Sequence, residues 1–134
     1  MTQARNYACL QTFGFLGMAQ TDNLSALNAA SQTTATRLNS KICRVVTSVS
    51  TGSVILPQQL TGENGPAPVI VINDSPNSIN LYPAAGETIN ALSANTAFAV
   101  PSLQTAVCIP NDVPPPHGGV ATGSNLNWGV ANIP

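Results

Sequence analysis

From residue 42 onward, short apolar runs alternate with residues that end strands, and this alternation limits what the chain can fold into. Turn signals recur about every 8–12 residues, a spacing typical of an all-β sandwich or barrel. Most of the runs are rich in Val and Ile and are closed by proline, glycine or an Asn/Asp/Ser cluster. They lie at 42–49, 53–56, 69–72, 79–82, 89–92, 97–100 and 105–109.

Three of these runs carry more specific expectations. The first pair, 42–49 and 53–56, is separated by Thr51-Gly52 and predicts a hairpin or a strand with a bulge at Gly52. The run 69–72 is continuously apolar, which is typical of a central strand covered on both faces.

The rest of the chain divides into two end segments around this core. The pattern predicts one domain, with an N-terminal arm and first strand or strands at 1–41, a β-sandwich core at 42–110 and a Pro/Gly-rich arm at 111–134. Residues 22–38 fit either a helix capped by Asp22 or a strand or extended loop. Three prolines at 114–116 favour an extended C-terminal arm, with a disordered end as the alternative.

The composition favours burial against a partner. Only 7% of the 134 residues are charged, against about 25% in typical domains, and Asn, Thr, Ser and Gln supply 45 residues. Neutral polar groups cost less to desolvate than charges, and a net charge of −1 gives little protection against association. The alternative is compositional drift in a stable β domain.

The four basic residues are too few for nucleic-acid binding, which needs several cations in one patch. Arg37, Lys41 and Arg44 are close in sequence, which is enough for one local acidic contact, and the alternative is a solvated strand edge. No run approaches the ~18 apolar residues of a transmembrane helix, and no signal peptide is expected. We therefore expect neither a nucleic-acid nor a membrane partner.

Residues for catalysis are scarce. His117 is the only histidine and lies in a Pro/Gly-rich segment, so neither a nucleophile–base pair nor a zinc site is expected. The carboxylates fall in predicted turns, where such groups usually cap backbone amides. The sequence thus predicts a non-enzyme with no catalytic, cofactor-binding or metal-binding residues.

Three cysteines, Cys9, Cys43 and Cys108, lack a CxxC spacing. We expect reduced thiols and assembly in a reducing cytoplasm, with a Cys43–Cys108 disulfide as the alternative.

Candidate interface residues follow from residue type. Buried aromatic side chains dominate protein–protein hot spots, so Phe13, Phe15 and Trp128 are candidate anchors, although each would serve equally in a core. An extended arm can also add a strand to a partner's sheet through backbone hydrogen bonds alone.

Residues 69–109 carry a resemblance to a known family. A strand ending in Asn, a turn, a strand ending in Tyr-Pro, a Gly turn, an Ile-Asn segment, an Ala-Asn stretch and a Phe-containing strand follow in order. The sequence resembles the capsid decoration (cement) proteins of tailed bacteriophages in this part, about a third of the chain. The matching residues are Asn73, Tyr82-Pro83, Gly86, Ile89-Asn90, Ala94-Asn95 and Phe98.

The resemblance implies a jelly-roll-like antiparallel β-sandwich, homodimers, and binding to the outside of a shell of HK97-fold major capsid protein. The expected location is the exterior of the virion, where the protein bridges neighbouring capsid subunits. The alternative is a receptor- or carbohydrate-binding module of a phage fibre. The proline-rich tail after Ile109 lies outside the shared pattern.

Overall fold

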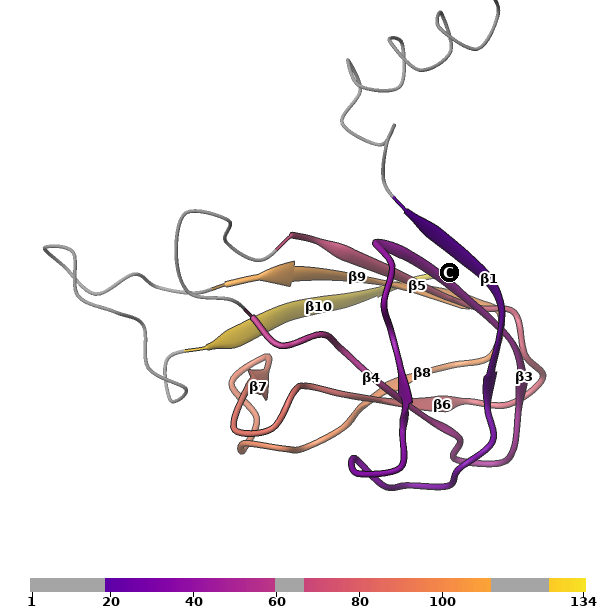
Figure 1. The fold of residues 1–134 in the computed structure, drawn as a ribbon, viewed down its shortest axis with the longest axis horizontal. Helices are drawn as coiled ribbons and strands as arrows, with labels where there is room; N and C mark the ends of the chain where they lie inside the picture. Colours follow the sequence, from indigo (N-terminus) through magenta and orange to yellow (C-terminus); the bar gives the residue numbers. More distant parts are fainter. Residues whose placement is uncertain (1–18, 60–66, 112–125) are drawn as a thin grey trace, which may run out of the picture.

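The computed structural model describes residues 19–59, 67–111 and 126–134, and this part of the chain is all-β (Figure 1). The expectation of an all-β protein is confirmed for these residues. The strands are β1 (Gln20–Ala26), β2 (Thr36–Arg37), β3 (Ile42–Ser48), β4 (Ser53–Ile55), β5 (Val69–Asn73), β6 (Ile79–Tyr82), β7 (Thr88–Ile89), β8 (Phe98–Val100), β9 (Gln104–Pro110) and β10 (Asn127–Ile133).

The strands form two sheets. The larger has six strands in the order β1-β3-β5-β9-β10-β7, and the smaller has four in the order β2-β4-β6-β8. Figure 1 shows β5, β9 and β10 in one layer, with β4, β6 and β8 in a second layer below it.

From β1 to β6 the chain changes sheet at every strand. Within this part of the chain the paired strands β1–β3, β3–β5, β2–β4 and β4–β6 are parallel, and so are β7 and β10. Pairs β5–β9, β9–β10 and β6–β8 are antiparallel. Both sheets are therefore mixed.

This pairing corrects two expectations. A purely antiparallel sandwich is wrong, and a jelly roll specifically is not confirmed. The predicted hairpin of 42–49 with 53–56 is also wrong, because β3 and β4 belong to different sheets. Gly52 instead allows a close approach, since a Cβ there would lie 2.1 Å from the carbonyl oxygen of Ala26.

One hydrophobic core lies between the layers. Side chains alternate across a strand, so every second residue of the larger sheet points inward. The buried side chains of β3, β5, β9 and β10 meet those of β4, β6 and β8 in a single cluster. Its largest members are Trp128, Leu38, Leu56, Ile79, Leu81 and Ile89.

The two end segments compare differently with expectation. Residues 22–38, for which both a helix and a strand were open, contain most of β1 and all of β2 and no helix. The predicted C-terminal arm is wrong for residues 126–134, because β10 pairs with β9 from Trp128 to Ile133 and lies inside the larger sheet. Alternation of Leu126, Trp128 and Val130, all buried, is the sequence signal for this strand.

The residues that carry the family resemblance hold turns and strand ends. The buried Asn73 amide donates to three carbonyls, of Asn77, Val100 and Pro101. Asn90 exchanges two hydrogen bonds of 2.8 Å with the backbone of Val130, and so ties the segment after β7 to β10. The side-chain contacts of Asn73 and Asn90 therefore hold the fold together.

Candidate interaction surfaces

The predicted interface residues do not form one site. Phe13 and Phe15 lie outside the described residues. Arg37 lies in β2 of the smaller sheet, whereas Lys41 directly precedes β3 of the larger sheet. The basic cluster at 37–44 is thus divided between the two sheets.

Arg44 has a local partner. Its Nε lies 2.5 Å from Oδ2 of Asp74, which directly follows the neighbouring strand β5. Both side chains are more than a third exposed, so this ion pair adds little stability. It does neutralise the one charge that β3 presents on the outer side of the larger sheet.

Trp128 is not an exposed anchor. It is 1% exposed, belongs to the core cluster, and donates from Nε1 to Oε2 of Glu87 at 2.9 Å. The other Glu87 oxygen, Oε1, accepts from the backbone N–H of Gln59 at 2.7 Å. The interpretation of Trp128 as an interface residue is therefore wrong.

The environment of Glu87 also differs from that of a turn residue. Its carboxyl is 1% exposed, and burial raises its pKa, opposed by the hydrogen bonds from Gln59 and Trp128. Because Glu87 follows the predicted turn at Ala85-Gly86, the sequence gave no indication that its side chain is buried.

Apolar side chains cover the outer side of the larger sheet. One row crosses four strands, from Ile42 through Ile70 and Val107 to Ala131. The adjacent row runs Arg44, Ile72, Thr105, Ile133 and so is mixed, and Ile109 lies near the end of β9. We call the seven apolar residues among these, Ile42, Ile70, Ile72, Val107, Ile109, Ala131 and Ile133, the outer apolar face.

The outer apolar face is accessible among the described residues. Ile109 is 54% exposed and Ile133 is 51% exposed. Val107, Ile109, Gly129 and Ala131 also line a shallow hollow of about 390 Å³. Gly129 has no side chain to fill this hollow. A Cβ there would meet only the Ile109 carbonyl oxygen, at 3.7 Å.

This face was not predicted, although the sequence held a signal for it. The continuous apolar run 69–72 indicated a strand covered on both sides. In the structure Val69 and Val71 are buried beneath the smaller sheet, whereas Ile70 and Ile72 are only half-buried on the other side. The second cover that the pattern requires is absent from the described part of the chain.

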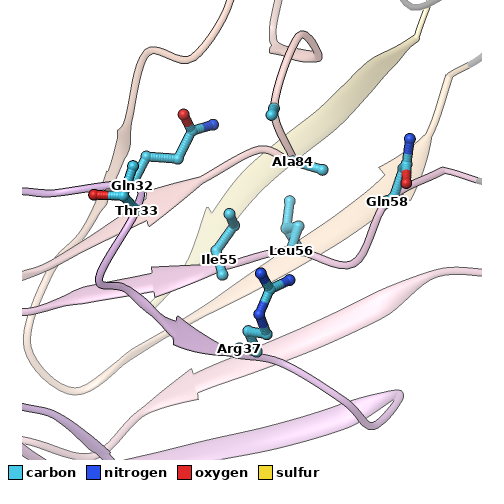
Figure 2. A pocket seen from close by; sticks show the side chains of 8 residues that line it. Gln32, Thr33, Arg37, Ile55, Leu56, Gln58 and Ala84 are labelled. Carbon is cyan, nitrogen blue, oxygen red and sulfur yellow. The ribbon is translucent and has the colours of Figure 1, made fainter.

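A second surface feature lies on the smaller sheet (Figure 2). It is a pocket of about 410 Å³ lined by side chains from β2, from β4 and the segment after it, from the turn after β6, and from the loop before β2. Arg37 and Ile55 are cross-strand partners in this pocket. Of the predicted interface residues, Arg37 lines this pocket.

Neither a metal-ligand cluster nor a long apolar helix is found in the described ranges. No three of His, Cys, Asp and Glu cluster among residues 19–59, 67–111 and 126–134. The same ranges contain no helix long and apolar enough to cross a membrane. Cys43 and Cys108 are free and buried, and Cys9 lies outside the described residues.

These features define an all-β domain of two packed, mixed sheets with an apolar sheet face and a polar pocket as candidate interaction surfaces. Comparison of the chain with known protein families, with curated proteins and with solved structures found no match.

Proposed function

We propose that this chain is a structural, non-catalytic virion protein that binds the outside of an HK97-fold capsid shell through the outer apolar face. It bridges neighbouring major capsid subunits and so stabilises the head. One observation carries the proposal: a row of apolar side chains crosses four strands of the larger sheet without a cover in the described part of the chain.

The dimensions of the face suit the centre of a protein–protein interface. Three strand spacings of about 4.8 Å place β10 about 14 Å from β3. Apolar patches of this extent usually mark interaction sites, and ordinary interfaces have an apolar centre with a polar rim. A standard interface takes about 800 Å² from each partner, so one subunit has room for two or three neighbours.

The lack of net charge on the outer apolar face indicates which kind of partner surface it would complement. The Arg44 guanidinium is paired with Asp74, and the seven residues of the face are all uncharged. A neutral, apolar patch on a protein therefore complements this face better than a polyanion does. Contacts of modest strength to linked capsid subunits add through high effective concentration.

The resemblance at 69–109 supports the assignment to decoration proteins. Its residues hold turns that organise the two sheets, as the contacts of Asn73 and Asn90 illustrate. The mixed pairing leaves the proposal intact, because docking needs a rigid apolar face rather than a jelly-roll topology. Homodimers and a place on the virion exterior belong to the proposal as well.

Binding to undecorated HK97-fold shells tests the proposal. We expect the protein to co-sediment with such shells and to raise their resistance to heat. Ile109→Glu and Ile133→Glu each place a charge on the outer apolar face and are expected to weaken binding at least tenfold. Leu27→Glu is the matched control, because Leu27 is 56% exposed and lies outside the face.

Two results would contradict the proposal. The first is no co-sedimentation and no thermal gain at saturating protein with any shell tried. The second is equal loss of binding in Leu27→Glu and in the two variants of the face. Sedimentation velocity of the isolated protein tests the homodimer separately.

A further inference from the structure

The pocket on the smaller sheet holds Arg37, a cation that has no ion-pair partner in the described part of the chain. Arg37 is exposed, and no carboxylate in the described part of the chain lies within ion-pair distance of it. Figure 2 shows its guanidinium directed toward Ile55 and Leu56, with Gln32 and Gln58 on opposite sides. An unpaired guanidinium in a concave site is suited to a carboxylate, which it can bind through two parallel hydrogen bonds.

The polar groups around Arg37 are amides and a hydroxyl. Gln32 is held in place, since its Nε2 donates to the Pro83 carbonyl at 2.8 Å and to Asn95 Oδ1 at 3.1 Å. Its Oε1 has no partner among the described residues and is free to accept from a ligand. Thr33 and Gln58 add further polar groups to the lining.

The rest of the lining is apolar. Ile55, Leu56, Ala84 and Ala85 contribute side chains to it. The volume of about 410 Å³ falls within the range of about 300–1,000 Å³ for small-molecule sites and is far larger than a single carboxylate fills. This lining would fit a compact molecule with a carboxylate, several hydroxyl groups and an apolar side.

We propose that this pocket binds an acidic sugar residue, a uronic or sialic acid unit of a surface polysaccharide. The Arg37 guanidinium binds the carboxylate, Gln32 Oε1 and the Gln58 amide bind ring hydroxyls, and Ile55 and Ala84 contact the C–H groups of the ring. An acidic peptide fits less well, because Arg37 is the single cation among the residues that line the pocket, whereas a run of carboxylates needs several positive partners.

The position of the pocket extends the function beyond shell binding. Arg37 and Ile55 are on the side of the smaller sheet that faces away from the core, because Val54, next to Ile55 in β4, is buried in the core cluster. The outer apolar face lies on the opposite side of the two-layer structure. A subunit seated on a shell by that face turns the pocket toward the surroundings of the particle, where host polysaccharides are met.

Titration of the isolated full chain with D-glucuronic acid and N-acetylneuraminic acid, followed by calorimetry or by amide NMR shifts, tests the inference. At least one of the two acidic sugars is expected to bind at least tenfold more tightly than D-glucose, which lacks the carboxylate, and than acetate, which lacks the ring and its hydroxyl groups. Arg37→Gln is expected to lose at least tenfold in affinity, and Arg37→Lys less. Lys41→Gln, which removes the same charge outside the pocket, is expected to bind as the parent does.

A second variant tests the cavity itself. Ala85→Phe adds a large side chain to the lining while keeping Arg37, and it is expected to abolish binding with an unchanged urea midpoint. The inference is overturned if acetate matches the acidic sugars, if Arg37→Gln binds normally, or if an Asp/Glu-rich peptide binds the pocket more tightly than either sugar. It is also overturned if neither sugar binds.

The outcome is separable from that of shell binding. Sugar titration needs no shell, and Ile109→Glu is expected to bind sugar normally while losing shells. Arg37→Gln is expected to show the reverse.

Discussion

Single polar side chains hold the turns of this protein, and Asn73 is the clearest example. Its Nδ2 reaches three carbonyl oxygens at 2.9–3.0 Å, and its Oδ1 accepts from the N–H and the hydroxyl of Ser75. The Asn73 side chain is completely buried, so water cannot take its place as a hydrogen-bond partner of these backbone and hydroxyl groups. One amide thereby joins the ends of β5 and β8 to the β5–β6 turn.

Asn73→Ala is expected to lower the free energy of unfolding by about 3 kcal/mol or more, because it leaves several buried groups without partners. Urea denaturation measures this loss. Asn80→Ala is the matched control and is expected to cost less than about 1 kcal/mol, since Asn80 makes one exposed bond of 3.3 Å to the Thr51 carbonyl. Equal costs at the two positions would contradict this account of Asn73.

Glu87 gives the protein a pH dependence of definite sign. Burial raises the pKa of its carboxyl above the ordinary value of 4.5. Its contribution to stability is therefore fully present below about pH 4.5, and it is lost as the pH rises through the higher pKa of the folded state.

The free energy of unfolding of the parent is expected to fall as the pH rises above 4.5, in part because Glu87 ionises. In Glu87→Gln this part of the fall should be absent. Urea denaturation at a series of pH values from 4 to 8 measures the slope. Asp22→Asn, which removes an exposed carboxylate, serves as the control. A slope in Glu87→Gln that equals the slope of the parent would show that Glu87 is not the responsible group.

Among the strands, the close approach of β1 and β4 depends on one glycine. A Cβ on Gly52 would lie 2.1 Å from the Ala26 carbonyl oxygen, which is backbone and cannot move without displacing the end of β1. Gly52→Ala is therefore expected to cost about 3 kcal/mol in thermal or urea unfolding. Gly129→Ala meets nothing closer than 3.7 Å and is expected to change stability by less than about 1 kcal/mol. A ranking opposite to this one would contradict the described contact.

The strands could largely be located from the sequence, but their pairing could not. Val and Ile runs marked β3, β5 and β9 because β-branched side chains favour strands, and proline closed several of them. Direction depends on which strands become neighbours, and nothing between β3 and β4 shows that the chain changes sheet there. β10 was missed because Asn127, Gly129 and Asn132 have low strand propensity, and pairing with β9 overrides it.

The candidate surfaces were even less predictable. Arg37 was identified by its charge, but its pocket requires Ile55 and Ala84, which lie 18 and 47 positions further along the chain by residue number. The outer apolar face is built from alternate residues of four strands, so it exists only once the register is fixed. Local composition therefore predicted a binding surface, and the position of the candidate surfaces depends on tertiary pairing.

For the molecule as a whole, two thiols report on the integrity of the core. Cys43 in β3 and Cys108 in β9 are both fully buried between the two sheets. Burial raises the pKa of both thiols, and for Cys108 burial together with the nearby Cys43 raises it to about 12. Because the thiolate is the reactive form, the folded protein protects Cys108 both by exclusion and by keeping it protonated.

We expect these two thiols to react with an aromatic disulfide reagent only when the whole domain unfolds. At pH 8, a pKa of about 12 leaves about one Cys108 in ten thousand as thiolate. Labelling of a Cys9→Ser variant isolates the two core thiols, and its rate should rise with urea in parallel with the rate of global unfolding. Cys43 and Cys108 should label together, because one core covers both. Rapid native labelling of either thiol would mean that the sheets separate locally, and a rigid platform for docking would then be excluded.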